Sequence, residues 1–118
     1  MYHYAEYLSV LSSLEGAPRS HVYTGIGVCL YHMEEFEYAF RCFEKAKAVY
    51  GLGLEVESVD NAILQNNIGC CLMMLNRNQE AMKYFELSHH ILDMKAGCFD
   101  ERTLVVQQNF NKNRKAYL

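Results

Sequence analysis

The chain has 118 residues, of which 51% are hydrophobic and 21% are charged. This composition fits one folded domain with its own core and argues against a disordered chain. The 11 basic and 14 acidic residues give a net charge of −3, a field too weak to favour nucleic acid or an anionic lipid surface as the partner.

Helically spaced apolar residues predict about six helices. The first covers residues 1–17 and ends near Gly16, which can adopt a left-handed C-cap conformation. The second covers residues 18–32 and begins at Pro18, whose ring suits the first turn of a helix. The third is expected over residues 35–50.

Three more helices are expected in the second half of the chain. Ser58 and Asp60 are candidate N-caps for a fourth helix that ends near residue 75. The fifth covers residues 79–95, and Asp100 can cap a sixth that reaches the C-terminus. No segment alternates as a strand would, and short turns make neighbouring helices antiparallel, so the sequence predicts an all-α fold.

The five cysteines are expected to be buried and reduced. Their number is odd, Cys70 and Cys71 are adjacent, and no CxxC spacing occurs, so neither a disulfide framework nor a metal site is favoured. No apolar run is long enough to span a membrane, and the N-terminus lacks the features of a secretory signal. We therefore expect a cytoplasmic protein without membrane insertion and without a cofactor.

The chain repeats itself after 42 residues. A glycine on one helix lets the next helix approach closely, and a phenylalanine further on fills the space beside it. A third copy is weaker, because Gly69 aligns with Asn111 and Leu72 with Arg114. The matched residues are Ile26, Gly27, Leu30, Ala39, Phe43 and Ala46 in one copy, and Ile68, Gly69, Leu72, Ala81, Phe85 and Ser88 in the other.

This pattern resembles the tetratricopeptide repeat family, and the 42-residue period and the run LQNNIG (64–69) are similar to its kinesin-light-chain subtype. The resemblance implies antiparallel helix hairpins stacked in a right-handed α-solenoid. It divides the chain into an N-terminal helix (1–17), repeat one (18–59), repeat two (60–99) and a terminal or capping helix (100–118).

The same resemblance implies a protein–protein interaction module, a scaffold or adaptor rather than an enzyme. Members of the family bind a peptide or helix of a partner in a concave groove lined by the first helix of each repeat. Asn67 and Asn109 occupy the place where the subtype uses asparagine to bind a ligand's backbone, and a carboxamide offers both donor and acceptor. The groove-facing residues expected to contact a partner are Thr24, Tyr31, Asn66, Asn67, Met73, Met74, Gln108, Asn109 and Lys112.

Other interpretations stay open. Met73 and Met74 are equally well explained by core packing, and Lys112 by a solvated helix end. The chain would alternatively be a fixed segment of a longer solenoid or of a multi-subunit cytoskeletal or ciliary assembly, an alternative that exposed Tyr4, Tyr7 and Leu11 would favour. An enzyme is disfavoured, since no phosphate-binding glycine loop and no evident oxyanion hole accompany the Cys and His residues.

Overall fold

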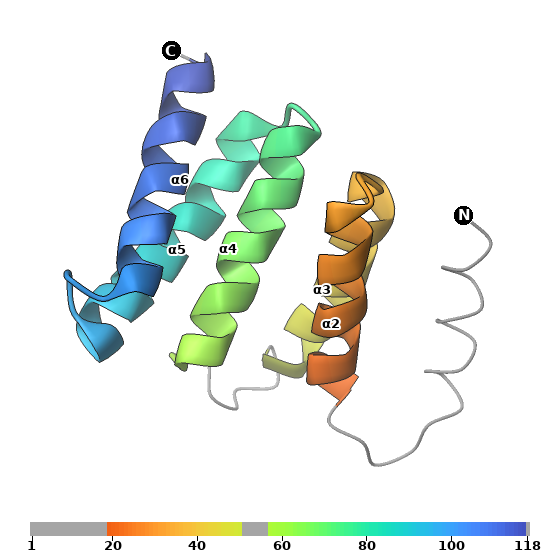
Figure 1. Cartoon of the computed structure of the whole chain (residues 1–118), viewed down its shortest axis with the longest axis horizontal. Helices are drawn as coiled ribbons and strands as arrows, with labels where there is room; N and C mark the ends of the chain where they lie inside the picture. Colours follow the sequence, from red (N-terminus) through yellow and green to blue (C-terminus); the bar gives the residue numbers. More distant parts are fainter. Residues whose placement is uncertain (1–18, 51–56, 118) are drawn as a thin grey trace.

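Five α-helices make up residues 19–50 and 57–117, the part of the chain that the computed structural model describes (Figure 1). They confirm the expected all-α fold, and their bounds lie within one or two residues of those expected. The predicted helix over residues 1–17 lies outside the described residues. The helices are α2 (Arg19–His32), α3 (Phe36–Tyr50), α4 (Val59–Met74), α5 (Asn78–Ala96) and α6 (Glu101–Tyr117).

Side chains begin two of the helices. The Ser58 hydroxyl accepts the backbone N–H of Asn61 at 3.1 Å and so caps α4, whereas Asp60 lies within the first turn and is not the N-cap. The Asp100 carboxylate accepts the backbone N–H of Arg102 at 2.9 Å, as expected for the start of α6.

The repeat is visible in two turns. Glu34 and Asn76, 42 positions apart, both have φ of 62°, in the left-handed region. Each also donates its backbone N–H to the residue three positions earlier, to the carbonyl of Tyr31 in one turn and of Met73 in the other. The α2–α3 and α4–α5 hairpins therefore turn in the same way.

The helices form two layers, and each runs antiparallel to the next in the chain. In Figure 1, α2, α4 and α6 lie in the front layer, and α3 and α5 lie behind them. Helix α4 contacts both α2 and α6, which places it in the middle of the front layer. The Lys47 ammonium donates to the Tyr84 hydroxyl at 3.1 Å and so joins α3 to α5 in the rear layer.

Two phenylalanine rings fill the hairpins. Phe43 and Phe85 are completely buried, and each ring lies against a glycine of the preceding helix. A Cβ atom on Gly27 would lie 2.5 Å from the Phe43 ring, and one on Gly69 would lie 2.7 Å from the Phe85 ring. The glycines are therefore needed for close approach, as the repeat predicts, and the ring of the following helix is what occupies the space.

Ser88, the small residue of the second copy, is completely buried and makes a hydrogen bond that the repeat does not predict. Its hydroxyl donates to the Ala62 carbonyl at 2.6 Å. This bond ties α5 to α4 of its own hairpin. A smaller apolar cluster joins α6 to α4 and α5 through Val106, Ala62 and Ile91.

The cysteines are all free thiols, but not all are buried. Cys42 and Cys71 are completely buried and Cys70 is partly so, whereas Cys29 and Cys98 are exposed. The expectation of burial was wrong for these two, because Cys29 contributes nothing to the core and Cys98 lies in the turn before α6. Among the described residues, no helix is both long enough and apolar enough to cross a membrane.

Candidate functional site

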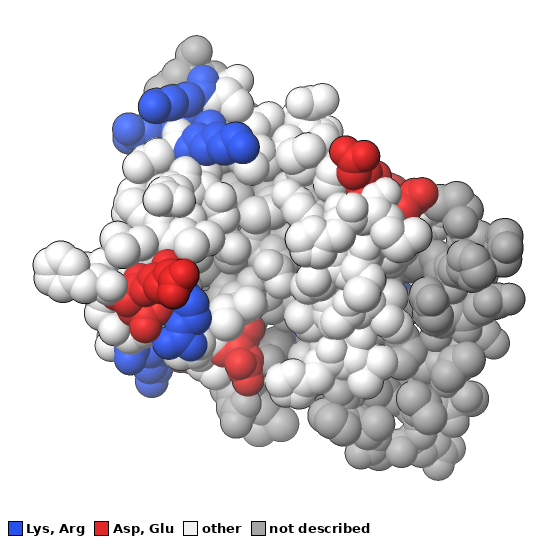
Figure 2. Space-filling view, in the orientation of Figure 1, with Lys and Arg blue, Asp and Glu red and all other residues white. Residues whose placement is uncertain are grey.

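All nine residues expected to contact a partner lie on α2, α4 and α6, which form the front layer. Figure 2 shows this layer from the same side. Among the described residues, the middle of the area over α2 and α4 shows no charged side chain, and acidic side chains appear only toward its two ends. Basic side chains gather over the C-terminal end of α6, whose last turn holds Arg114 and Lys115. The central part of this face is therefore suited to an uncharged partner surface.

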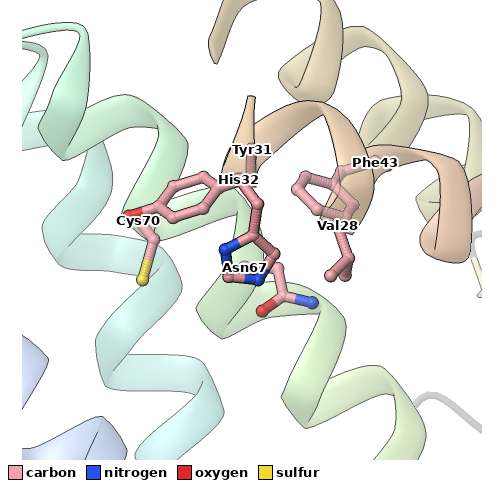
Figure 3. A pocket seen from close by; sticks show the side chains of 6 residues that line it. All are labelled: Val28, Tyr31, His32, Phe43, Asn67 and Cys70. Atoms are coloured by element: carbon pink, nitrogen blue, oxygen red, sulfur yellow. The ribbon is translucent and has the colours of Figure 1, made fainter. Parts of the chain in front are cut away.

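A pocket of about 170 Å³ lies between α2 and α4 (Figure 3). Tyr31 forms one wall, and its ring is held edge-on against Phe36, with 5.1 Å between ring centroids. Partial burial raises the pKa of the Tyr31 hydroxyl, which keeps this wall uncharged. The pocket is lined by Val28, Tyr31, His32, Phe43, Asn67 and Cys70.

Asn67 supplies the carboxamide of the pocket. The residue is partly buried on α4 and faces the α2 side chains in Figure 3. No described residue is hydrogen-bonded to its side chain, so both its donor and its acceptor can bind a ligand. A peptide unit, with one N–H and one carbonyl, is the group that this pair matches.

Asn109, at the equivalent place on α6, has a different environment. Its amide nitrogen donates to the Asn66 side-chain oxygen at 3.0 Å and lies 3.6 Å from the Cys70 sulfur. Its N–H groups are thus engaged with α4. The structure brings Asn66 and Asn109 together as partners of each other, an arrangement that sequence reasoning did not anticipate.

The other expected contact residues are spread over the face. The Thr24 hydroxyl donates to the Ser20 carbonyl at 2.7 Å within α2. Met73 packs against the core, which supports the alternative interpretation for this residue, while Met74 is 45% exposed. Gln108 and Lys112 are exposed on α6. Tyr31 and Asn67 are the two that line the pocket.

Four pocket residues were not among the nine. The resemblance to the repeat family also implies groove-facing places for Val28, His32 and Cys70, and the structure brings these three together in the pocket lining. Phe43 was expected only as core, and its contribution to the pocket depends on how α3 lies behind the gap between α2 and α4. The helical spacing of apolar residues cannot predict that a residue of one helix lines a gap between two others.

No family model, no curated protein and no solved structure matches this chain. Within the described ranges, no group of three or more His, Cys, Asp and Glu residues is placed to hold a metal ion. The functional proposal therefore depends on the internal repeat and on the pocket between α2 and α4.

Proposed function

We propose that this chain is a protein–protein interaction module of the tetratricopeptide type, with the 42-residue period of the kinesin-light-chain subtype. Its hairpins would stack as a right-handed α-solenoid in which α2, α4 and α6 line the concave face. Support comes from the two glycine–phenylalanine contacts and the two matching turns, which recur at the period of the sequence repeat.

The ligand that we propose is a peptide or helix of another protein. The observation that carries this proposal is the pocket between α2 and α4, whose carboxamide at Asn67 has no hydrogen-bond partner among the described residues. A volume of about 170 Å³ is below the roughly 300 Å³ at which small-molecule pockets begin, so the pocket suits one side chain of a larger ligand. The module would act as a scaffold or adaptor in the cytoplasm, in a cytoskeletal or ciliary setting.

One observation favours the second candidate, a fixed segment of a larger assembly. Large apolar side chains are exposed around the turn between α5 and α6, where Phe99 is 90% and Met94 is 66% exposed. Leu104 on α6 adds to them at 47%. Large exposed apolar residues are typical of contact surfaces, and a neighbouring subunit would cover these.

An affinity pull-down from cell extract distinguishes the two candidates. The wild type is compared with Asn67→Ala and with Asn111→Ala, a matched asparagine that is exposed on α6 and outside the pocket. We expect Asn67→Ala to lose specific partners at unchanged helicity, while Asn111→Ala retains them. Equal recovery by all three proteins would contradict a groove-binding function and favour the assembly segment.

A further inference from the structure

The front layer contains two equivalent seams, the lines along which α2 meets α4 and α4 meets α6. Asn67 and Asn109, 42 positions apart, hold the same place in the repeat, one at each seam. The residues across from them correspond in the same way, Thr24 to Asn66 and Val28 to Cys70. The two seams can therefore be compared position by position within one molecule.

The α4–α6 seam is closed by side chains. Asn109 reaches across it, donates to the Asn66 oxygen at 3.0 Å and lies 3.6 Å from the Cys70 sulfur. Both contacts require an acceptor on α4, and both acceptors are present.

The α2–α4 seam is not closed in this way. Val28, in the place of Cys70, has an aliphatic side chain and no acceptor. The Thr24 hydroxyl, in the place of the Asn66 carboxamide, donates to the Ser20 carbonyl of its own helix at 2.7 Å and accepts no bond from Asn67. Asn67 thus makes no hydrogen bond across its seam to any described residue. A pocket is found there in place of a bond.

We infer that Asn109 is a latch that closes the α4–α6 seam, and that Asn67 alone binds a peptide unit of the ligand, in the α2–α4 seam. This inference rests on the proposed function and deepens it. Asn109 is then a positioning residue for α4 and α6 and has no direct part in recognition.

The pocket also defines the chemistry of the ligand. Apolar surface from Val28, Tyr31 and Phe43 lines it, and no Asp, Glu, Lys or Arg does. The remaining lining residues are His32, Asn67 and Cys70, so a charged side chain would be dehydrated there without a carboxylate, lysine or arginine to pair with it, which is costly. The occupant is therefore an uncharged segment that inserts one aliphatic or aromatic side chain, while its adjacent peptide unit binds the Asn67 carboxamide.

Nuclear magnetic resonance of the full chain tests this assignment with a minimal probe, N-acetyl-L-leucine N-methylamide. This probe has one aliphatic side chain between two peptide units. We expect the side-chain amide signals of Asn67 to shift saturably and those of Asn66 and Asn109 to stay unchanged. A saturable shift at Asn109 as large as that at Asn67, or no saturable shift at Asn67, would overturn the inference. The aspartate analogue of the probe should cause no saturable shift.

A double variant gives the α2–α4 seam the two acceptors that Asn109 contacts in the α4–α6 seam. Thr24→Asn with Val28→Cys places both acceptors of the closed seam opposite Asn67. We expect probe affinity to fall about ten-fold, the equivalent of one engaged hydrogen-bonding group, in a protein that keeps its dispersed spectrum. Unchanged affinity in a folded variant would contradict the inference.

The latch has its own test without any ligand. Asn66→Ala and Asn109→Ala should each lower the equilibrium constant for folding, and the double variant should be less destabilised than the sum of the two. Strict additivity would overturn the latch. If Asn109→Ala loses extract partners at unchanged helicity as completely as Asn67→Ala does, the latch is wrong and the proposed function stands. If neither variant loses partners, the proposed function fails.

Discussion

Two glycines in α2 have opposite surroundings. A Cβ atom on Gly27 would lie 2.5 Å from the buried Phe43 ring, whereas one on Gly25 would have no atom within 4 Å. Gly27→Ala should therefore destabilise the fold by about 1–3 kcal/mol through overpacking. Gly25→Ala should leave stability unchanged or raise it by up to about 1 kcal/mol, because alanine favours a helix interior. Urea unfolding of both variants measures the difference, and equal effects would contradict the packing of α2 on α3.

Burial also separates the cysteines. It raises the pKa of the Cys42 thiol to about 11 and that of Cys71 to about 12, from an ordinary value of 9.0. In the unfolded chain these thiols lose their protons near pH 9, but in the folded chain they keep them, so unfolding is favoured as pH rises above 9. We expect the free energy of unfolding to decline above pH 9, and less steeply in Cys71→Ala. The same slope in both proteins would show that Cys71 is not the cause.

The rates at which the cysteine thiols of the folded protein react with a labelling reagent at pH 8 test their burial independently. Cys29 and Cys98 are exposed and should react rapidly, while Cys42 and Cys71 should react only on unfolding. Rapid reaction of all five thiols would contradict the arrangement of the core.

The turns of the α2–α3 and α4–α5 hairpins have different residues at their left-handed position. Asn76 adopts a left-handed conformation that asparagine tolerates, whereas Glu34 adopts the same φ of 62° at a conformational cost. Glu34→Asn should stabilise the protein by about 1 kcal/mol, and the reciprocal Asn76→Glu should destabilise it by a similar amount. Thermal unfolding followed by circular dichroism checks both variants. Effects of the same sign in the two turns would contradict their equivalence.

Helix α6 is held at its far end by a fully buried asparagine. Asn113 accepts the Asn78 side-chain amide at 2.9 Å and donates to the Asn78 carbonyl at 2.8 Å. Asn113→Ala removes both bonds and leaves the Asn78 side-chain amide without its partner on α6, so we expect a loss of about 2–3 kcal/mol in urea unfolding. Asn111→Ala, exposed on the same helix, should change stability by less than about 0.5 kcal/mol. A comparably small loss for Asn113→Ala would contradict this anchoring of α6 on α5.

The helices and their order could be predicted from sequence because each combines a helically spaced apolar stripe with a stop signal. The start of α6 at Asp100 and the burial of Phe43 and Phe85 follow from those local patterns. Contacts across seams could not be predicted in this way. Asn66, Asn67 and Asn109 look alike along the chain, and only the spacing of α2, α4 and α6 determines which of them meet.

At the scale of the whole molecule, the repeat has two tight hairpins and a different third helix. Asn111 stands where Gly69 admits the Phe85 ring, and Arg114 stands where Leu72 is buried. A phenylalanine could not approach α6 at Asn111 as Phe85 approaches α4, since even a Cβ atom on Gly69 would lie 2.7 Å from that ring. Any segment that covers this side of α6 must therefore pack in another way.

If a partner protein binds the front layer over α2 and α4, site-specific photo-crosslinking should capture it there. A photoreactive residue replaces Met74, exposed on α4 of the front layer, or Lys83, exposed on α5 of the rear layer, and each protein is irradiated in cell extract. We expect discrete crosslinks from position 74 that excess wild-type chain abolishes and excess Asn67→Ala chain does not. Crosslinks from position 83 alone, or equal competition by the two chains, would contradict binding at this layer.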